Sequence, residues 1–335
     1  MDQGGQTRRQ MLSAAIGGAA GIVLGAPVRR LSAAPAQAAS DAPATLRLGD
    51  DLFVVRIPGE ANVVAHTGAG GVLLVDGGSA GASDALMKAV ASLPGGGPVH
   101  TVFNTHWHPE QTGSNERLGK AGKTIIAQEN TRLWLAADVT WPWDGRRFKR
   151  LPKIAQPNKT LYTTGTLDTL STGTSARRSL GSTGTPARRS LGIRYGHIPD
   201  AAHTDGDLYV YFPDQNVLAV GDVVSGQGWP AVDWVTGGWI GGIVGGLQRL
   251  QTLANEDTRI VPARGPLLSL ADLKAQSEMY QTIYDRLTQL LNKGRAPGEA
   301  VAARPTKEFD AQMGNPDEFV RRAFESLWAY VSPDA

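Results

Sequence analysis

The chain of 335 residues contains no cysteine. It can therefore form no disulfide bond, and any metal it binds must be held by histidine or carboxylate rather than by thiolate. Charge of one sign is not in excess either, because the formal net charge is only +2. Beyond the N-terminal region, no apolar run is long enough to span a bilayer. Histidine is scarce, with six residues, so two that stand close together in the sequence are informative.

Residues 1–39 have the three parts of an export signal. Arg8 and Arg9 precede an apolar run that ends at Val28, and Ala36-Gln37-Ala38 offers a cleavage site. This order predicts a twin-arginine (Tat) signal, with export by the Tat machinery to the periplasm or the medium; the alternative is a disordered basic tail. The segment carries four arginines and one aspartate, a charge of +3, so cleavage leaves the mature chain near −1. We therefore expect no nucleic-acid partner and no stable membrane insertion after cleavage.

Two histidines, His106 and His108, follow the short apolar run 99–103, which predicts a strand. Side chains two residues apart on an extended segment point to the same side, so both imidazoles can reach one metal ion. Zinc accepts such ligands, and its third ligand usually comes from elsewhere in the chain. His203 is the candidate, and Asp222 adds a carboxylate at the end of a later apolar run.

The rest of the chain alternates between strand-like and helix-like patterns. The predicted strands are 46–57, 61–66, 71–75, 99–103, 123–127, 208–212 and 217–222. The predicted helices are 83–92, 115–121, 129–137, 269–293 and 316–331. Ser83 is expected to cap the first helix. Strands that alternate with helices indicate a layered α/β domain.

The order of its motifs makes the chain resemble the metallo-β-lactamase fold superfamily over most of its length, from about Leu46 to about Leu270. The landmarks are the Asp76 turn, His106-Trp107-His108, the segment 202–207, Gly221-Asp222 and the segment 261–266. The resemblance implies a four-layer αβ/βα sandwich over residues 40–295. A helical extension, 296–335, is expected to pack on the same domain.

The departures from the family pattern concern a second metal. The family motif is His-x-His-x-Asp-His, whereas this chain has Glu110 and Gln111 at its last two positions. A further family histidine is replaced by Arg264. Glutamine is a poor metal ligand and arginine stays protonated, so the resemblance implies that the second site has lost two nitrogen ligands. Asp222, which bridges two metals in many relatives, could still bind one.

By the same resemblance the first site, made of His106, His108 and His203, is complete. We therefore expect one zinc ion per chain rather than two. Arg264 is expected to stand in for the second metal by pairing with Asp222 or Glu110; the alternative is that it points into solvent from a surface turn.

The resemblance and the ligands together favour a hydrolase. Its substrate would be an ester, lactone, thioester or amide, attacked by a metal-bound hydroxide, with Glu110, or else Asp222, as the proton acceptor. A first alternative is a mononuclear iron oxygenase that uses His203, Asp222 and one histidine of the pair. A second alternative is a pseudoenzyme that uses the old site for binding.

Two further segments bear on the substrate and on the domain. Trp229 and Trp234 lie in a glycine-rich run after Asp222, where they would overhang the site and suit a small, apolar or aromatic substrate; the alternative is that they only pack. Residues 171–181 and 182–192 form an 11-residue tandem repeat. We interpret it as a lengthened surface loop rather than a basic arm, because loop insertions cost little free energy.

Overall fold

A computed structural model describes residues 43–167 and 192–331 of the chain. The predicted signal at 1–39 and the repeat up to residue 191 lie outside these ranges. Within them, no helix combines the length and the apolar character that a membrane span requires.

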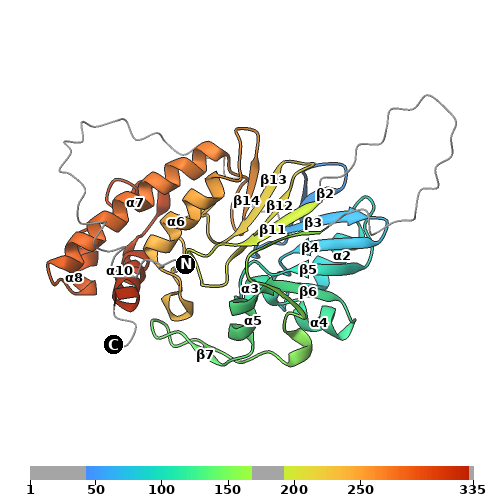
Figure 1. Ribbon diagram of the computed structural model, residues 1–335, viewed down its shortest axis with the longest axis horizontal. Coiled ribbons are helices and arrows are strands. Elements are labelled where there is room, and N and C mark those ends of the chain that lie inside the picture. The colour runs from blue at the N-terminus through green and yellow to red at the C-terminus, as the bar shows by residue number, and fades with distance from the viewer. Residues whose placement is uncertain (1–42, 168–191, 332–335) are drawn as a thin grey trace, which may run out of the picture. The chain divides into compact units, whose positions relative to one another are not determined.

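The core contains two β-sheets that pack face to face (Figure 1). The first has seven strands in the order β1 (Ala44–Arg47), β2 (Leu52–Arg56), β3 (Val63–Gly68), β4 (Gly71–Val75), β5 (Val99–Phe103), β6 (Thr124–Gln128) and β9 (Lys159–Leu161). The second has five, in the order β10 (Thr164–Leu167), β11 (Ile193–His197), β12 (Leu208–Phe212), β13 (Val217–Gly221) and β14 (Arg259–Pro262). A separate hairpin pairs β7 (Val139–Thr140) with β8 (Arg147–Phe148).

Each sheet contains parallel strands, and these decide where functional side chains gather. β4, β5, β6 and β9 run parallel in the first sheet, and β13 and β14 run parallel in the second. Parallel strands are buried on both faces, which explains the apolar sequences of β4 and β13. Their carboxyl ends lie at one edge, the usual place for a ligand site in an α/β sheet.

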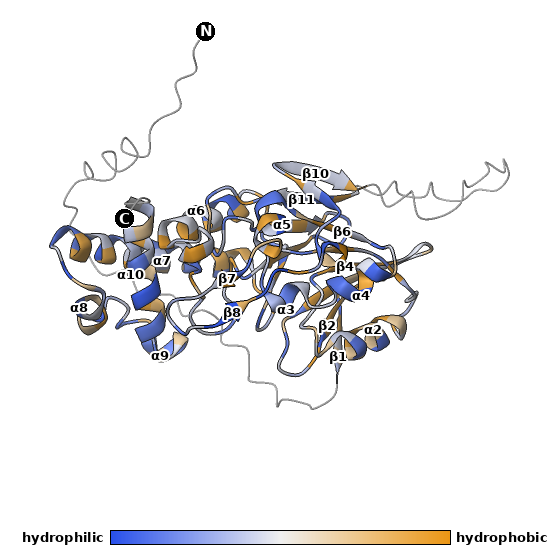
Figure 2. Cartoon of the chain, turned by 90° about the horizontal axis from the view of Figure 1, so that it is seen from below, coloured by the Kyte–Doolittle hydropathy of each residue, from blue (hydrophilic) through white to orange (hydrophobic). Residues whose placement is uncertain are grey.

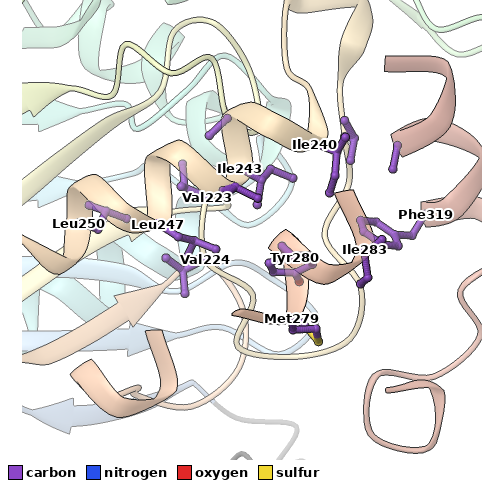
Figure 3. Close-up of a cluster of buried hydrophobic side chains, with 14 of the residues drawn as sticks. Val223, Val224, Ile240, Ile243, Leu247, Leu250, Met279, Tyr280, Ile283 and Phe319 are labelled. Atoms are coloured by element: carbon purple, nitrogen blue, oxygen red, sulfur yellow. The ribbon is translucent and has the colours of Figure 1, made fainter. Parts of the chain in front are cut away.

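Helices cover the outer faces of both sheets. Against the first sheet lie α2 (Ser83–Ala91) and α4 (Asn115–Lys120), whose Leu86 and Leu118 join its outer core. Against the second lie α6 (Ile240–Gln251), α7 (Leu270–Asn292) and α10 (Asp317–Val331), which share one large apolar cluster (Figure 3). The four layers are therefore helix, sheet, sheet and helix, as expected.

Shorter elements connect these layers. They are α3 (Pro109–Thr112), α5 (Glu129–Leu135), η1 (Lys153–Ala155), η3 (Trp234–Thr236), α8 (Pro297–Ala302) and α9 (Asp310–Met313). The C-terminal helices belong to the same fold, because α10 packs on α6, α7 and α8. Orange and blue stretches alternate along the helices in Figure 2, as amphipathic helices with one buried face require.

Two local predictions were wrong. The run 46–57 is two strands, β1 and β2, separated by a turn at Gly49 to Asp51. Ser83 does not cap α2, because Ala82 is the capping residue and makes no side-chain hydrogen bond. The Ser83 hydroxyl instead accepts a hydrogen bond from Ser114 Oγ at 3.0 Å, which ties α2 to the segment before α4.

Candidate metal centre

The segment that carries the histidine pair leaves β5 in a fixed conformation. Asn104 follows the strand and donates to the Gln111 carbonyl at 3.0 Å and to Asn115 Oδ1 at 3.1 Å. Pro109 begins α3 directly after His108, a position where proline costs nothing because no backbone donor is needed. The His-x-His segment is thus held between a buried strand and a short helix.

Three histidines meet at the carboxyl edge of the two sheets. His106 and His108 come from the first sheet, and His203 comes from the loop between β11 and β12 of the second. All three are buried, and their ligand nitrogens lie within 4.8 Å of one another. The structure therefore brings the three predicted ligands together, and the other three histidines, His66, His100 and His197, lie outside this group.

The hydrogen bonds of His203 and His108 leave two lone pairs facing each other. His203 Nδ1 lies 2.8 Å from the Ala231 carbonyl, which can only accept, so this nitrogen carries the proton. His108 Nε2 lies 2.9 Å from Asp233 Oδ2 and carries the proton for the same reason. The remaining nitrogens, His203 Nε2 and His108 Nδ1, are 3.1 Å apart with no proton between them in the neutral forms. A cation placed among them would relieve this repulsion.

His106 completes this arrangement. Its Nε2 is buried and has no hydrogen-bond partner among the described residues, which is unusual for a buried ring nitrogen. Burial, and then the charges of His203, His108 and Arg264, hold the pKa of His106 well below its usual value. A neutral imidazole is the form that binds a metal. The three side chains therefore fit a metal ion.

Asp76 anchors the segment from the neighbouring strand end. Its Oδ1 accepts from Thr105 N at 2.8 Å and from Thr105 Oγ1 at 3.0 Å, and Thr105 Oγ1 lies 3.2 Å from His106 Nδ1. Burial raises the pKa of Asp76 to about 8, although the Thr105 hydrogen bonds lower it. Its φ of 68° marks the sharp turn after β4.

Asp233 also belongs to the site, although it was not predicted from the sequence. It is 1% exposed, and its Oδ2 accepts from His108 Nε2, from Thr236 Oγ1 at 2.7 Å and from Trp141 Nε1 at 3.3 Å. Burial raises its pKa, but the hydrogen bond and charge of His108 and the bond from Thr236 leave it below the usual value. A carboxylate that orients a metal-binding histidine is common in metal sites. The sequence shows Asp233 only as a residue suited to capping η3.

Asp207 supports the third histidine in a similar way, through the backbone. Its Oδ2 accepts from His203 N at 2.7 Å and from Thr204 N at 3.0 Å. Asp207 is 1% exposed, so these bonds are shielded from solvent. The motif 202–207 thus folds into a compact turn that fixes the position of His203.

Asp222 and Gln111 occupy the region beside His106. Asp222 Oδ2 lies 3.5 Å from His106 Nε2 and accepts from Gln111 Nε2 at 3.2 Å. Gln111 is fully buried, and its Oε1 has no partner in the described part of the chain. The Gln111 side-chain amide therefore occupies the side of Asp222 at which a second metal ion would need a further ligand.

Arg264 does not form the expected pair. Its side chain is exposed at the end of β14, and no ion pair joins it to Asp222 or Glu110 in the described ranges. It nevertheless lines the same pocket as both carboxylates, and its charge is felt at His106. Glu110 is half-buried in this pocket and has no hydrogen bond to any residue that the structure describes.

The site opens into a pocket of about 230 Å³. The loop after Asp222 lines it, as predicted, and Trp229 lies in this wall. Trp234 is not among the lining residues and packs against Trp143, with ring centroids 5.7 Å apart. Three further lining residues were not predicted from the sequence: Trp141, Arg146 and Arg322. They come from the β7–β8 hairpin and from α10, whose proximity to the site depends on tertiary contacts.

Comparison with known proteins agrees with this geometry. The family model described as the metallo-beta-lactamase superfamily matches residues 56–263, more than half of the chain. The chain belongs to this superfamily. The matched range includes all three histidines, Asp222 and the strands of both sheets from β3 to β14.

Solved structures of other superfamily members share the fold. A metallo-beta-lactamase from Pontibacter korlensis is 18% identical, with a TM-score of 0.52, and the match covers 71% of this chain and 99% of that one. The DIM-1 metallo-beta-lactamase is 15% identical, with a TM-score of 0.51 and coverage of 72% and 98%. At such low identity, the likeness shows the fold alone. No curated protein matches the sequence.

Proposed function

We propose that this superfamily member is a zinc-dependent hydrolase with one metal ion per chain, acting on an ester, lactone, thioester or amide. The observation that carries the proposal is the set of three buried histidine nitrogens that lie within 4.8 Å of one another, one of which, His106 Nε2, has no hydrogen-bond partner among the described residues. Zinc bound there would act as a Lewis acid and lower the pKa of a bound water to about 7.

The chain's own residues then divide the remaining work. Asp233, Ala231 and Thr105 fix the orientation of the three imidazoles. Asp222 accepts a hydrogen bond from Gln111 and lies beside His106. These contacts restrict the motion of its carboxylate, which suits the binding of a ligand. Glu110 faces the pocket without a partner among the described residues, and we assign it the role of proton acceptor.

The pocket walls support a small-molecule substrate with an apolar or aromatic part. Trp141 and Trp229 both line the pocket. Trp229 is held in place because its ring stacks on Phe319 at a centroid distance of 4.7 Å and its Nε1 donates to the Gly314 carbonyl at 3.0 Å. A fixed aromatic wall of this kind favours a planar or apolar group over a strongly hydrated one.

Glu110→Gln tests the hydrolase proposal, because it keeps the shape of the side chain and removes the proton acceptor. After a screen of esters, lactones, thioesters and β-lactams for a substrate, this variant should lose about 10²-fold or more in kcat while it retains its zinc. Glu116→Gln, an exposed residue of α4, is the matched control and should keep full activity. Full activity in Glu110→Gln would make Asp222 the candidate proton acceptor. If none of the screened esters, lactones, thioesters and β-lactams is turned over, the hydrolase proposal is contradicted.

We also propose that the protein is exported through the Tat machinery to the periplasm or the medium. The support is the twin arginine at Arg8-Arg9, followed by the apolar run and the Ala36-Gln37-Ala38 site. Replacing both arginines with lysine should retain the protein in the cytoplasm when cell fractions are compared. Unchanged export would contradict this route.

A further inference from the structure

Three guanidinium groups line the pocket that leads to the histidines. Arg264 follows β14, Arg146 lies in the β7–β8 hairpin, and Arg322 comes from α10. The two carboxylates of the same pocket, Glu110 and Asp222, belong to the segments beside the metal ligands. Positive charge therefore comes from three separate elements that carry no metal ligand.

Arg322 is the least expected of the three. Its side chain is 7% exposed, although long charged side chains are rarely buried unless they are fully paired. Glu318, one turn earlier on α10, pairs with one end of the guanidinium, and the ring of Trp143 lies 4.4 Å away. Its Nε is buried with no hydrogen-bond partner among the described residues. A buried cation that is only partly paired is costly unless a ligand in the pocket that Arg322 lines balances its charge.

Arg264 and Arg146 present their charges differently. Arg264 is exposed and makes no ion pair or side-chain hydrogen bond with the residues that the structure describes. Arg146 pairs with Asp144 at 2.7 Å, and its guanidinium lies 4.4 Å from the centroid of the Trp141 ring, which holds it at the pocket wall. Within the described ranges, Arg264 is thus an unpaired cation, whereas Asp144 and Trp141 orient Arg146.

We propose that the substrate carries an anionic oxygen group, which binds between Arg264 and Arg322 while the scissile bond lies at the three histidines. Arg146 borders this anion subsite beside Trp141. Guanidinium groups bind carboxylate and phosphonate oxygens through paired N–H donors, which gives orientation as well as affinity. A pocket of about 230 Å³ suits a small acid. The inference rests on the proposed function for the position of the scissile bond, but the anion subsite can be tested without turnover.

The test is calorimetric titration of the zinc-loaded protein with phenylacetate, phenylphosphonate and the neutral phenylacetamide. Both anions should bind at least 10-fold more tightly than the amide, and the tighter of the two identifies the oxyanion class. Arg264→Gln and Arg322→Gln should each weaken anion binding by 10-fold or more and leave amide binding unchanged. Arg321→Gln changes an exposed neighbour on α10 outside the pocket lining and should bind as the original protein does.

Equal binding of the anions and the amide would overturn the proposal. So would anion binding that Arg264→Gln leaves unchanged, because the anion would then be held by the metal alone. Arg264 decides the test because its side chain is exposed and its replacement leaves the core intact, whereas Arg322 is buried. Anion binding without hydrolysis of any substrate would contradict the hydrolase proposal only, and hydrolysis without the arginine effect would contradict the anion subsite only.

Discussion

Gln111 shows how one side chain changes the capacity of the site. Its side-chain amide donates to Asp222 Oδ2 at 3.2 Å. A neutral hydrogen-bond donor therefore lies where the family motif has a metal-binding histidine. Glu110 and Arg264, the other two departures from the motif, face the same pocket. We propose that the three replacements together remove a second cation site, while His106, His108 and His203 stay close enough to share one ion.

Restoring the family residues tests this interpretation. The triple variant Glu110→Asp, Gln111→His and Arg264→His should bind a second zinc ion, measured as metal per chain after dialysis, because it returns two nitrogen ligands beside Asp222. Gln111→His alone should not gain a stable second ion. A well-folded triple variant that still holds one ion would show that the surrounding pocket has also diverged.

Asp233 is the residue whose role depends most on the fold. Asp233→Asn keeps the shape but weakens the acceptor for His108 Nε2, so the imidazole loses the charge that fixes its tautomer. We expect metal affinity, measured by competition with a chelator, to fall about 10- to 100-fold. Asp257→Asn, on the surface, is the control and should leave affinity unchanged. Unchanged metal affinity in Asp233→Asn would show that Asp233 does not support metal binding.

The residue-level predictions succeeded where sequence spacing determines geometry. His106 and His108 stand two apart in the short segment between β5 and α3, so the spacing predicts their convergence, although the segment bends and Asn104 helps to hold it. Asp233 and Arg322 could not be found in this way. Asp233 reaches the site through its contact with His108, more than 100 residues away in the sequence. Arg322 reaches the pocket only because the C-terminal helix α10 packs beside it.

Helix α6 controls the position of the third histidine. A Cβ atom on Gly242 would collide with the backbone oxygens of Asp200 and Ala201, and one on Gly238 would collide with the His203 carbonyl. Glycine therefore lets the helix and the segment before it approach the loop of His203 more closely than any other residue would allow. The sequence shows the glycine-rich run, but its partner is visible only in the folded chain.

Gly242→Ala tests this close approach. The added methyl group should push the loop 200–203 away from α6, lowering the free energy of unfolding by about 1–3 kcal/mol and weakening metal binding. Gly298→Ala, on α8, is the matched control, because a Cβ there meets no atom within 4 Å. Denaturant unfolding and chelator competition measure both effects. Equal stability and affinity in the two variants would show that the close contact is unimportant.

The element boundaries were predicted well where clear breaks flank the apolar pattern. The helix expected over 269–293 is α7, Leu270–Asn292, and Ser269 and Asp272 form its capping box. β5 and β12 have the predicted bounds. The run 46–57 was misread because apolar residues on both sides of a tight turn form one continuous pattern, and only cross-strand pairing separates β1 from β2.

For the whole molecule, the order of the motifs was enough to predict the layers, because that order carries the resemblance to a superfamily whose fold is a four-layer sandwich, and the two sheets do share one core. The composition of the pocket was not predictable. α10 lies beyond the range of the family match, yet its Arg322 lines the pocket and its Phe319 stacks on the lining residue Trp229, so this helix helps to form the pocket as well as covering the second sheet.

Metal content is the measurement that tests the central claim most directly. The purified protein, dialysed against metal-free buffer and analysed by elemental mass spectrometry, should retain about one zinc ion per chain, and His108→Ala or His203→Ala should retain none. Iron in place of zinc would favour the oxygenase alternative. Two ions that resist dialysis would contradict the single-site account, and no stoichiometric metal in a folded protein would contradict the metal centre itself.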